Sequence, residues 1–535
     1  MKNLRLIISF LVCVSLVLFF SSYKGNNGDK TKITGVDTGN MYIGWASADI
    51  TPDKPVLLIG QMYARISEGV RDPLTVTALA IESGTGPSSE KAIMISCDLV
   101  CISDAFTEKD NLRENVRELL KVSLPELRPE QIIINATHTH TAPLGSSASA
   151  KDYYGIDLNV MPLADYLDFS CRRIASAAEQ AWKNRKPGGI SFGLGHAVVG
   201  HNRLAVYMSG KSVMYGKTDK PEFSHVEGAE DPSVNLLYTW DNKSKLTGMI
   251  INIGCPSQES ESDYLISADY WHDTRLEVRH RLGKDIYILP QCSAAGDQSP
   301  HILVGAKAEE RMQLLMGPDS VKTGKGSLGQ RKQIAVSIAD AVTSVLPYMK
   351  ANIEWSPVFE HRMEIVNLSK RLISIEDVNN TSKEIEQWKK RYDSLLLEIK
   401  ENPAMKEKPR WYKQITKSYS MISYEQSVMD RYDLQKTQPL MPVEIHVLRV
   451  GDIVMATNPF ELYLDYGLRI KGRSPAVQTF IVQLTNGYSG YLPTQRAVAG
   501  GSYGAVAASN LIGPEGGQEL VEKTLELINA VWQKK

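Results

Sequence analysis

Short apolar runs alternate along the chain with amphipathic stretches of helical period, and this alternation predicts an α/β fold. Segments 42–50, 75–82 and 91–97 have the apolar patterns of strands, and helical periodicity follows at 106–122. Three consecutive isoleucines at 132–134 then indicate a short, fully buried strand. This strand–helix–strand order favours a mixed β-sheet core flanked by helices.

The second half of the chain continues the pattern, with one interruption. We expect a helix at 165–184, a hairpin of strands 235–240 and 246–253, strands at 285–290, 443–450 and 453–456, and a final helix at 517–533. The segment from about 367 to 437 is more charged and predicts a helical insertion. Its part from 382 to 401 carries an apolar stripe and is expected to cover the mouth of a site, unless it is only a solvated hairpin.

The amino terminus has the pattern of a targeting segment. Basic Lys2 and Arg5 precede an apolar run from 6 to 20, which is short for a membrane span of about 20 residues. We expect a signal peptide or an uncleaved anchor at 1–24, a polar linker at 25–40 and one domain at 41–535. An exported protein of the periplasm, the cell surface or the medium follows from this reading.

Composition narrows the function classes. The chain has 535 residues, of which 43% are hydrophobic and 23% charged, and its net charge is −1. This balance is typical of a globular protein and excludes a nucleic-acid partner recruited by charge. Six cysteines, of which Cys13 lies in the apolar leader, are too few for a disulfide scaffold of this length.

Candidate chemistry begins directly after the isoleucine strand. His138 and His140 are two residues apart, so an extended chain would point both imidazoles to one side. Neutral imidazole is a common zinc ligand. The pair therefore indicates either part of a metal site or two hydrogen-bonded histidines at the end of a strand.

Further candidates follow other predicted strands. Asp297 and Ser299 lie in a run of small residues after 285–290, where the serine could be a nucleophile, an oxyanion donor or part of a capped turn. Cys255 follows 246–253 and could be a buried thiol, a disulfide partner of Cys292 or a thiolate ligand. Glu461 comes just after 453–456. Such strand ends are where α/β sites are assembled.

The order of these motifs resembles the neutral/alkaline (non-lysosomal) ceramidase family over residues 42 to about 510. The matching stretches are Gly44–Thr51, Asn135–Pro143, His201–Arg203, Gly296–Pro300, Asn458–Glu461 and Thr485–Tyr488. The resemblance implies an exported, zinc-dependent hydrolase that cleaves a linear amide, with a small-molecule or lipid-like substrate. Association with a membrane surface stays open.

The resemblance also implies the site residues. Zinc would be bound by His138, Glu461 and Tyr488, with Tyr491 as a rival for Tyr488. Cys255 would stand where the family has its second zinc histidine. Ser299 would be the nucleophile in a motif that includes Asp297, His140 would relay a proton near the metal, and Arg203 would hold the substrate.

Two departures from the family keep alternatives open. At the Cys255 position, His272 or His301 could replace the missing histidine, or the site could lack metal. After the expected helix 517–533 we also expect no room for the family's carboxy-terminal β-sandwich, and this departure argues against ceramide itself as the substrate. The alternatives are an esterase or another hydrolase that acts on a cell-envelope lipid or glycan derivative, and a non-catalytic binding relative.

Overall fold

The computed structural model describes residues 41–84, 89–106, 109–316 and 328–533. The expected leader at 1–24 and linker at 25–40 lie outside these ranges. Within them, no helix is both long and apolar enough to cross a membrane.

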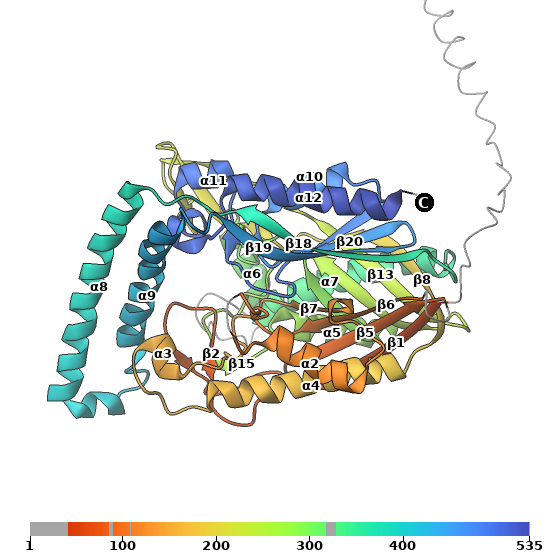
Figure 1. The fold of residues 1–535 in the computed structure, drawn as a ribbon, viewed down its shortest axis with the longest axis horizontal. Coiled ribbons are helices and arrows are strands. Elements are labelled where there is room, and N and C mark those ends of the chain that lie inside the picture. The colour runs from red at the N-terminus through yellow and green to blue at the C-terminus, as the bar shows by residue number, and fades with distance from the viewer. Residues whose placement is uncertain (1–40, 85–88, 107–108, 317–327, 534–535) are drawn as a thin grey trace, which may run out of the picture. The chain divides into compact units, whose positions relative to one another are not determined.

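The core is an eight-stranded mixed sheet in the order β16-β14-β13-β8-β1-β5-β6-β7 (Figure 1). The β14–β16 and β6–β7 pairs are parallel, and the other pairs are antiparallel. The strands are β1 (Met41–Asp49), β5 (Thr75–Ser83), β6 (Glu90–Cys97), β7 (Ile132–Ala136), β8 (Lys186–His196), β13 (Ser233–Asp241), β14 (Leu246–Ile253) and β16 (Tyr287–Cys292). The predicted α/β fold with a mixed sheet is confirmed.

A second sheet packs face to face on the first. It has the order β18-β19-β20-β22, with β18 (Phe359–Ser369), β19 (Leu440–Val450), β20 (Ile453–Thr457) and β22 (Gln478–Val482). Trp45 and Leu79 of the large sheet and Leu448 and Phe480 of the small one belong to a single buried apolar cluster. Burial of such side chains on two facing sheets excludes water from the space between them.

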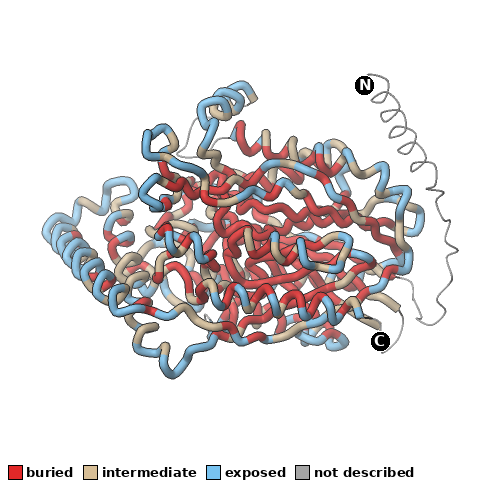
Figure 2. Tube along the Cα trace, turned by 90° about the horizontal axis from the view of Figure 1, so that it is seen from above, coloured by how far each residue is buried: buried red, intermediate tan, exposed pale blue. Residues whose placement is uncertain are grey.

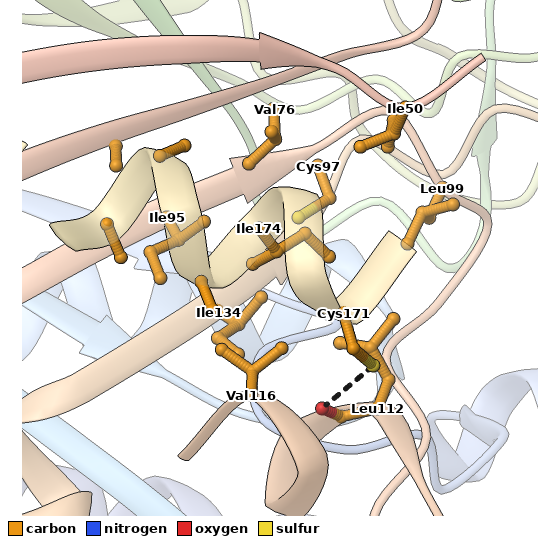
Figure 3. Packing of buried hydrophobic residues seen from close by; sticks show 14 of the residues in the cluster. Ile50, Val76, Ile95, Cys97, Leu99, Leu112, Val116, Ile134, Cys171 and Ile174 are labelled. Carbon is orange, nitrogen blue, oxygen red and sulfur yellow. Dashed lines mark hydrogen bonds between the residues drawn. The ribbon is translucent and has the colours of Figure 1, made fainter. Parts of the chain in front are cut away.

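Helices cover the outer faces of both sheets. Helices α2 (Leu112–Ser123) and α4 (Leu163–Lys183) share a core with β5, β6 and β7 (Figure 3), and α5 (Tyr270–Leu282) and α7 (Leu328–Lys350) share one with β13 and β14. Helices α10 (Leu464–Arg473) and α12 (Pro514–Trp532) pack on the smaller sheet. Figure 2 shows the buried interior that these layers enclose.

Short strands and helices lie within the connections between the larger elements. The short strands are β2 (Leu57–Leu58), β3 (Arg65–Ile66), β4 (Gly69–Val70), β9 (His201–Asn202), β10 (Leu204–Tyr207), β11 (Ser212–Met214), β12 (Phe223–Val226), β15 (Leu265–Ile266), β17 (Gln298–Ser299), β21 (Glu461–Leu462) and β23 (Tyr491–Leu492). The short helices are α3 (Ala150–Tyr154), α6 (Ala306–Met316), α11 (Gln495–Gly500), η1 (Pro129–Gln131), η3 (Tyr503–Ala505) and η4 (Ala507–Ser509).

The helical insertion consists of α8 (Ile375–Glu401), η2 (Pro403–Glu407) and α9 (Lys413–Leu434), which connect β18 to β19. Helix α9 lies against the body and α8 lies outside it (Figure 1). On α8, Leu396 is 39% and Leu397 54% exposed. No residue of α8 is among those that line the cavity described below, and the expectation that 382–401 covers the mouth of the site stays a prediction.

Candidate functional site

The predicted site residues gather where several strands end. His138 follows β7, Ser299 lies in β17 after β16, Glu461 begins β21 after β20, and Tyr488 follows β22. A cavity of about 390 Å³ opens among them. It is lined by Ile59, Gly60, Gln61, Met62, Val100, Cys101, His138, His140, Arg203, Met214, Tyr215, Glu261, Glu461, Tyr488, Tyr491 and Tyr503. We call it the polar cavity.

The polar cavity brings together three of the four predicted metal ligands. His138 Nδ1 lies 2.7 Å from the carbonyl oxygen of Val100, which assigns the proton to Nδ1 and directs Nε2 into the cavity. Glu461 Oε2 lies 3.4 Å from His138 Nε2. The Tyr488 hydroxyl donates to Glu461 Oε1 at 3.0 Å.

Burial and charge fix the protonation of these groups. Burial alone would raise the pKa of Glu461, but His138 and Arg203 beside it lower that pKa below its ordinary value. Burial, together with the Glu461 carboxylate, holds the pKa of Tyr488 well above its ordinary value. An ionised carboxylate therefore accepts from a protonated phenol.

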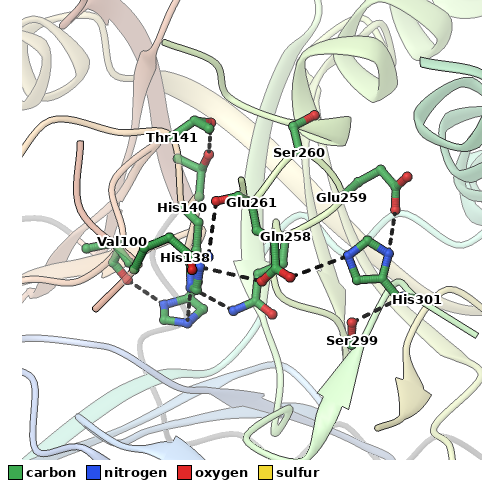
Figure 4. Close-up of polar contacts among 12 residues, drawn as sticks. Val100, His138, His140, Thr141, Gln258, Glu259, Ser260, Glu261, Ser299 and His301 are labelled. Atoms are coloured by element: carbon green, nitrogen blue, oxygen red, sulfur yellow. Dashed lines mark hydrogen bonds and ion pairs between the residues drawn. The ribbon is translucent and has the colours of Figure 1, made fainter. Parts of the chain in front are cut away.

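The two histidines meet, but not through strand alternation. Strand β7 ends at Ala136, and His138 has a left-handed backbone with φ 65°. A positive φ is costly for a residue other than glycine and recurs at functional sites. His140 Nε2 lies 3.3 Å from His138 Nε2 and 2.7 Å from the side-chain amide Nε2 of Gln258 (Figure 4). Burial, then the neighbouring His138, lowers the pKa of His140 well below its ordinary value.

Arg203 is a fixed cation on the wall of the cavity. Its Nη2 donates to the carbonyl oxygen of Gly296 at 2.9 Å and to the Tyr491 hydroxyl at 3.1 Å. Tyr491 is also hydrogen bonded to Glu461. Both candidate tyrosines therefore contact the same carboxylate, Tyr488 directly facing it and Tyr491 linking it to Arg203.

Ser299 lies behind the cavity wall. Its side chain is fully buried, and its Oγ is 3.1 Å from the Tyr215 hydroxyl, which does line the cavity. The backbone N–H of His301 donates to the same Oγ at 3.1 Å. Tyr215 has φ 54°, a second left-handed residue at this site. Ser299 therefore reaches the cavity through Tyr215.

Asp297 does not line the polar cavity. Its Oδ2 accepts from the Asn202 amide at 2.9 Å, and its Oδ1 accepts from the backbone N–H of Leu464 at 2.9 Å. The backbone N–H of Arg203 donates to the Asp297 carbonyl oxygen at 3.0 Å. These bonds make Asp297 a residue that positions Arg203 and the start of α10, so its predicted place in the catalytic set is not supported by the geometry.

Cys255 does not join His138 and Glu461. It is fully buried in the cluster under α5 and α7, with Sγ 3.6 Å from the Val199 carbonyl oxygen. Burial, then Cys292, raises the pKa of the thiol well above its ordinary value, so a thiolate is disfavoured. Cys255 and Cys292 are both free thiols, so the disulfide is not formed, and Cys255 is not among the residues that line the polar cavity.

The alternative histidines do not fill the fourth position either. His272 lies on α5 and does not line the polar cavity. His301 Nδ1 is 3.3 Å from Glu259 Oε2, and its Nε2 is 3.9 Å from Glu261 Oε1 (Figure 4). Glu261 Oε2 is in turn 3.9 Å from His140 Nδ1. Glu261 thus connects the two histidine-bearing loops.

The donor set still fits a metal ion in part. In the described portion of the chain, no three histidine, cysteine, aspartate or glutamate side chains are grouped as a metal site would group them. What remains is one imidazole, one carboxylate and one phenol. The lone pair of His138 Nε2 faces the Glu461 carboxylate at 3.4 Å, and two electron-rich atoms so placed are satisfied by a cation between them.

Sequence reasoning missed the residue that organises the walls of the cavity. Arg65 of β3 is fully buried and donates to the carbonyl oxygens of Glu261 at 3.0 Å, Asp263 at 2.7 Å and Ile59 at 2.7 Å. It also donates to the carbonyl oxygen of His140. One guanidinium thus joins three loops. Nothing in the local sequence around Arg65 distinguishes it from a surface arginine.

A search against protein-family models gives no match, and a search of curated proteins gives none either. Solved structures do match. A ceramidase complexed with C2 has a TM-score of 0.64 at 16% identity, over 92% of this chain and 75% of that one. The neutral ceramidase from Pseudomonas aeruginosa has a TM-score of 0.61 at 17% identity, with the same shares covered.

This chain has the fold of the neutral ceramidases. Each of these two matches covers 92% of this chain.

Proposed function

We propose that this protein is a zinc-dependent hydrolase that cleaves a linear N-acyl amide. The observation that carries the proposal is the meeting of His138, Glu461 and Tyr488 in one cavity with Arg203 and His140, within a ceramidase fold. One structural neighbour is a ceramidase complexed with C2, which supports a lipid amide as the substrate class.

His138, Glu461 and Tyr488 would hold the zinc ion. When bound, zinc would act as a Lewis acid on the substrate carbonyl and lower the pKa of water toward about 7. Side chains of the cavity would bind the developing charge and transfer the proton. Arg203 donates hydrogen bonds from a position fixed by Gly296, which suits it to hold the negative charge that develops on the carbonyl oxygen.

His140 supplies the proton transfer. Its depressed pKa keeps the imidazole neutral near pH 7, so it can accept a proton and return it to the leaving amine. Gln258 at 2.7 Å fixes the orientation of the ring. Ser299 and Tyr215 form a hydroxyl pair at the edge of the cavity, which could deliver a nucleophile or position one.

Metal content and turnover test the proposal together. The full chain, purified without chelator and supplied with zinc, should hold about one zinc per chain. It should also cleave an N-acyl amide faster with zinc than after chelation. His138→Ala and Glu461→Gln should lose both properties, whereas Glu526→Gln, at an exposed position of α12, should keep both.

Other outcomes separate the alternatives. Less than roughly a tenth of a zinc per chain would reject the metal assignment. Cleavage of the ester but not of the amide with the same acyl group would make the protein an esterase. Zinc-dependent binding of these compounds without turnover would make it a binding relative.

Export is part of the same proposal, because the basic and apolar start of the sequence is typical of a secretory signal. Fractionation of cells that express the full chain tests it. Protein confined to the cytosolic fraction would contradict export.

A further inference from the structure

A second, apolar cavity adjoins the polar cavity. It has a volume of about 260 Å³ and shares Ile59, Val100, Cys101 and Tyr488 with its neighbour. Its other lining residues are Leu99, Ser103, Leu112, Pro143, Leu144, Gly145, Tyr153, Tyr166 and Ser170. We call it the apolar cavity. Its inner wall, with Leu99 and Leu112, belongs to the core under α2 and α4 (Figure 3).

The hydroxyl groups along this wall already have partners in the protein. Tyr166 donates to the Ile50 carbonyl oxygen at 3.1 Å, and Ser170 donates to that of Leu167 at 3.0 Å. Tyr153 donates to Ser146 at 3.2 Å. Ser103 Oγ accepts from the backbone N–H of Leu112 at 3.0 Å. Since these groups do not require a ligand, the cavity favours an apolar occupant.

The two cavities differ in charge as well as polarity. Of the two cavities, Arg203, Glu261 and Glu461 line the polar one, and no charged side chain of the described residues lines the apolar one. The cavities meet beside Tyr488, which contacts Glu461. A substrate whose carbonyl lies near Arg203 could therefore extend a hydrocarbon chain past Tyr488 into the apolar cavity. Its amine would then face the Glu261 carboxylate, which suits a positive charge on the released amine.

We propose that the apolar cavity is the acyl-chain subsite of this protein and that it selects acyl groups of medium length. This inference rests on the proposed function, because it assigns the acyl half of that substrate. At about 30 Å³ per small heavy group, the cavity has room for about eight or nine such groups. The structure thus favours an acyl chain of about eight carbons over an acetyl group or a long fatty acid.

The variant Gly145→Leu tests the subsite by filling it. A Cβ at Gly145 would meet Leu167 and Tyr166 at 3.4 Å, which is ordinary van der Waals contact, and the backbone there needs no positive φ, so the first added carbon is tolerated. Gly145→Ala is the matched control because it adds one carbon only. Leu144→Phe, at a residue that lines the apolar cavity and not the polar one, fills the cavity from another wall and serves if Gly145→Leu fails to fold.

The first readout is binding of fatty carboxylates to the zinc-supplied full chain by calorimetry, which does not depend on turnover. Octanoate should bind at least about ten times more tightly than butanoate, because each buried methylene strengthens binding roughly fourfold. Gly145→Leu should remove this preference and Gly145→Ala should largely keep it. Octanoate should also bind more tightly than octylamine.

The second readout is turnover of N-acyl amides of graded chain length. Gly145→Leu should keep most activity on the acetyl amide and lose at least about tenfold on the octanoyl amide. Equal effects on both chain lengths, no preference for octanoate in the wild type, or tighter binding of octylamine would overturn the acyl subsite. Length-selective binding without any amide cleavage would keep the subsite and reject the proposed reaction, so the two failures are distinguishable.

Discussion

Replacement of Arg65 tests whether one buried guanidinium holds the candidate site together. Arg65 donates four hydrogen bonds to backbone carbonyl oxygens of the loops at Ile59, His140 and 261–263. The variant Arg65→Met keeps a similar apolar stem but removes all four bonds. Arg65→Lys keeps the charge but cannot place donors in the same fork, because an ammonium is a compact group.

The expected magnitude follows from these contacts. Hydrogen bonds to a charged group contribute about 1.5 kcal/mol each at the low end, or about 6 kcal/mol for four. Relief of the desolvation of a buried charge offsets several kcal/mol of this sum. We therefore expect Arg65→Met to lower the free energy of unfolding by about 2–4 kcal/mol, a large share of an ordinary protein's stability.

Urea denaturation of the purified domain measures this loss, and hydrogen exchange locates it. Exchange should rise in 57–66, 138–145 and 257–266 and remain unchanged in the strands of the smaller sheet. Turnover should fall as well, because the same loops carry His140 and Glu261. Arg473→Lys, at an exposed ion pair on α10, is the control and should leave both measurements unchanged.

Arg65 does not hold the site together if the free energy of unfolding of Arg65→Met lies within about 0.5 kcal/mol of the wild-type value and hydrogen exchange shows no local rise. A stability loss spread evenly over the whole domain would also contradict it, because a common core residue would give that result. Arg65→Lys should lie between the wild type and the methionine variant.

Two further variants address the predicted site directly. If Ser299 is the nucleophile, Ser299→Ala should lower turnover by at least about a thousandfold and Tyr215→Phe by much less. Steady-state kinetics measures both losses. Similar losses in the two variants would make Ser299 a positioning residue that acts through Tyr215. Cys255→Ala should keep its zinc content by mass spectrometry and most of its turnover, because the thiol lies in the core. Loss of zinc on this substitution would contradict that placement, and Cys255→His should destabilise the fold by about 1–3 kcal/mol through overpacking.

The long strands and helices could be predicted because the regular spacing of apolar residues, which is visible in the sequence, also determines which face of each element is buried. Strands β1, β5, β6, β7, β13, β14, β19 and β20 all lie within a few residues of the predicted ranges. The start of α2 was placed too early, at 106. Phe106 donates its backbone N–H to Asp104 in a turn, and the helix begins only after Asn111, whose side chain accepts from the backbone N–H of Glu114. Capping chemistry rather than apolar period decides that boundary.

The site residues could be predicted only where their motif directly follows a strand, because the end of the strand fixes where the motif lies. The stretches with His138, Glu461 and Tyr488 each follow a strand: His138 follows β7 of the eight-stranded sheet, and the other two follow the parallel pair β20 and β22 of the smaller sheet. What a strand end cannot reveal is the direction of the next side chain. Gly200 packs against the backbone at Gly254, where a Cβ would meet the Gly254 carbonyl oxygen at 2.1 Å. This close approach directs Cys255 toward Val199 and the core.

The placement of Cys255 changes the role of its whole loop. A thiolate ligand would have added a second negative charge beside Glu461 and weakened zinc as a Lewis acid. With Cys255 held as a neutral thiol, the donor set of His138, Glu461 and Tyr488 carries one formal negative charge before any proton leaves the phenol. The loop instead supplies Gln258, which contacts both His140 and Arg203. The segment that the ceramidase resemblance assigns to metal binding thus orients the proposed proton acceptor and the proposed oxyanion donor, and a zinc ion held without a thiolate would be the stronger Lewis acid.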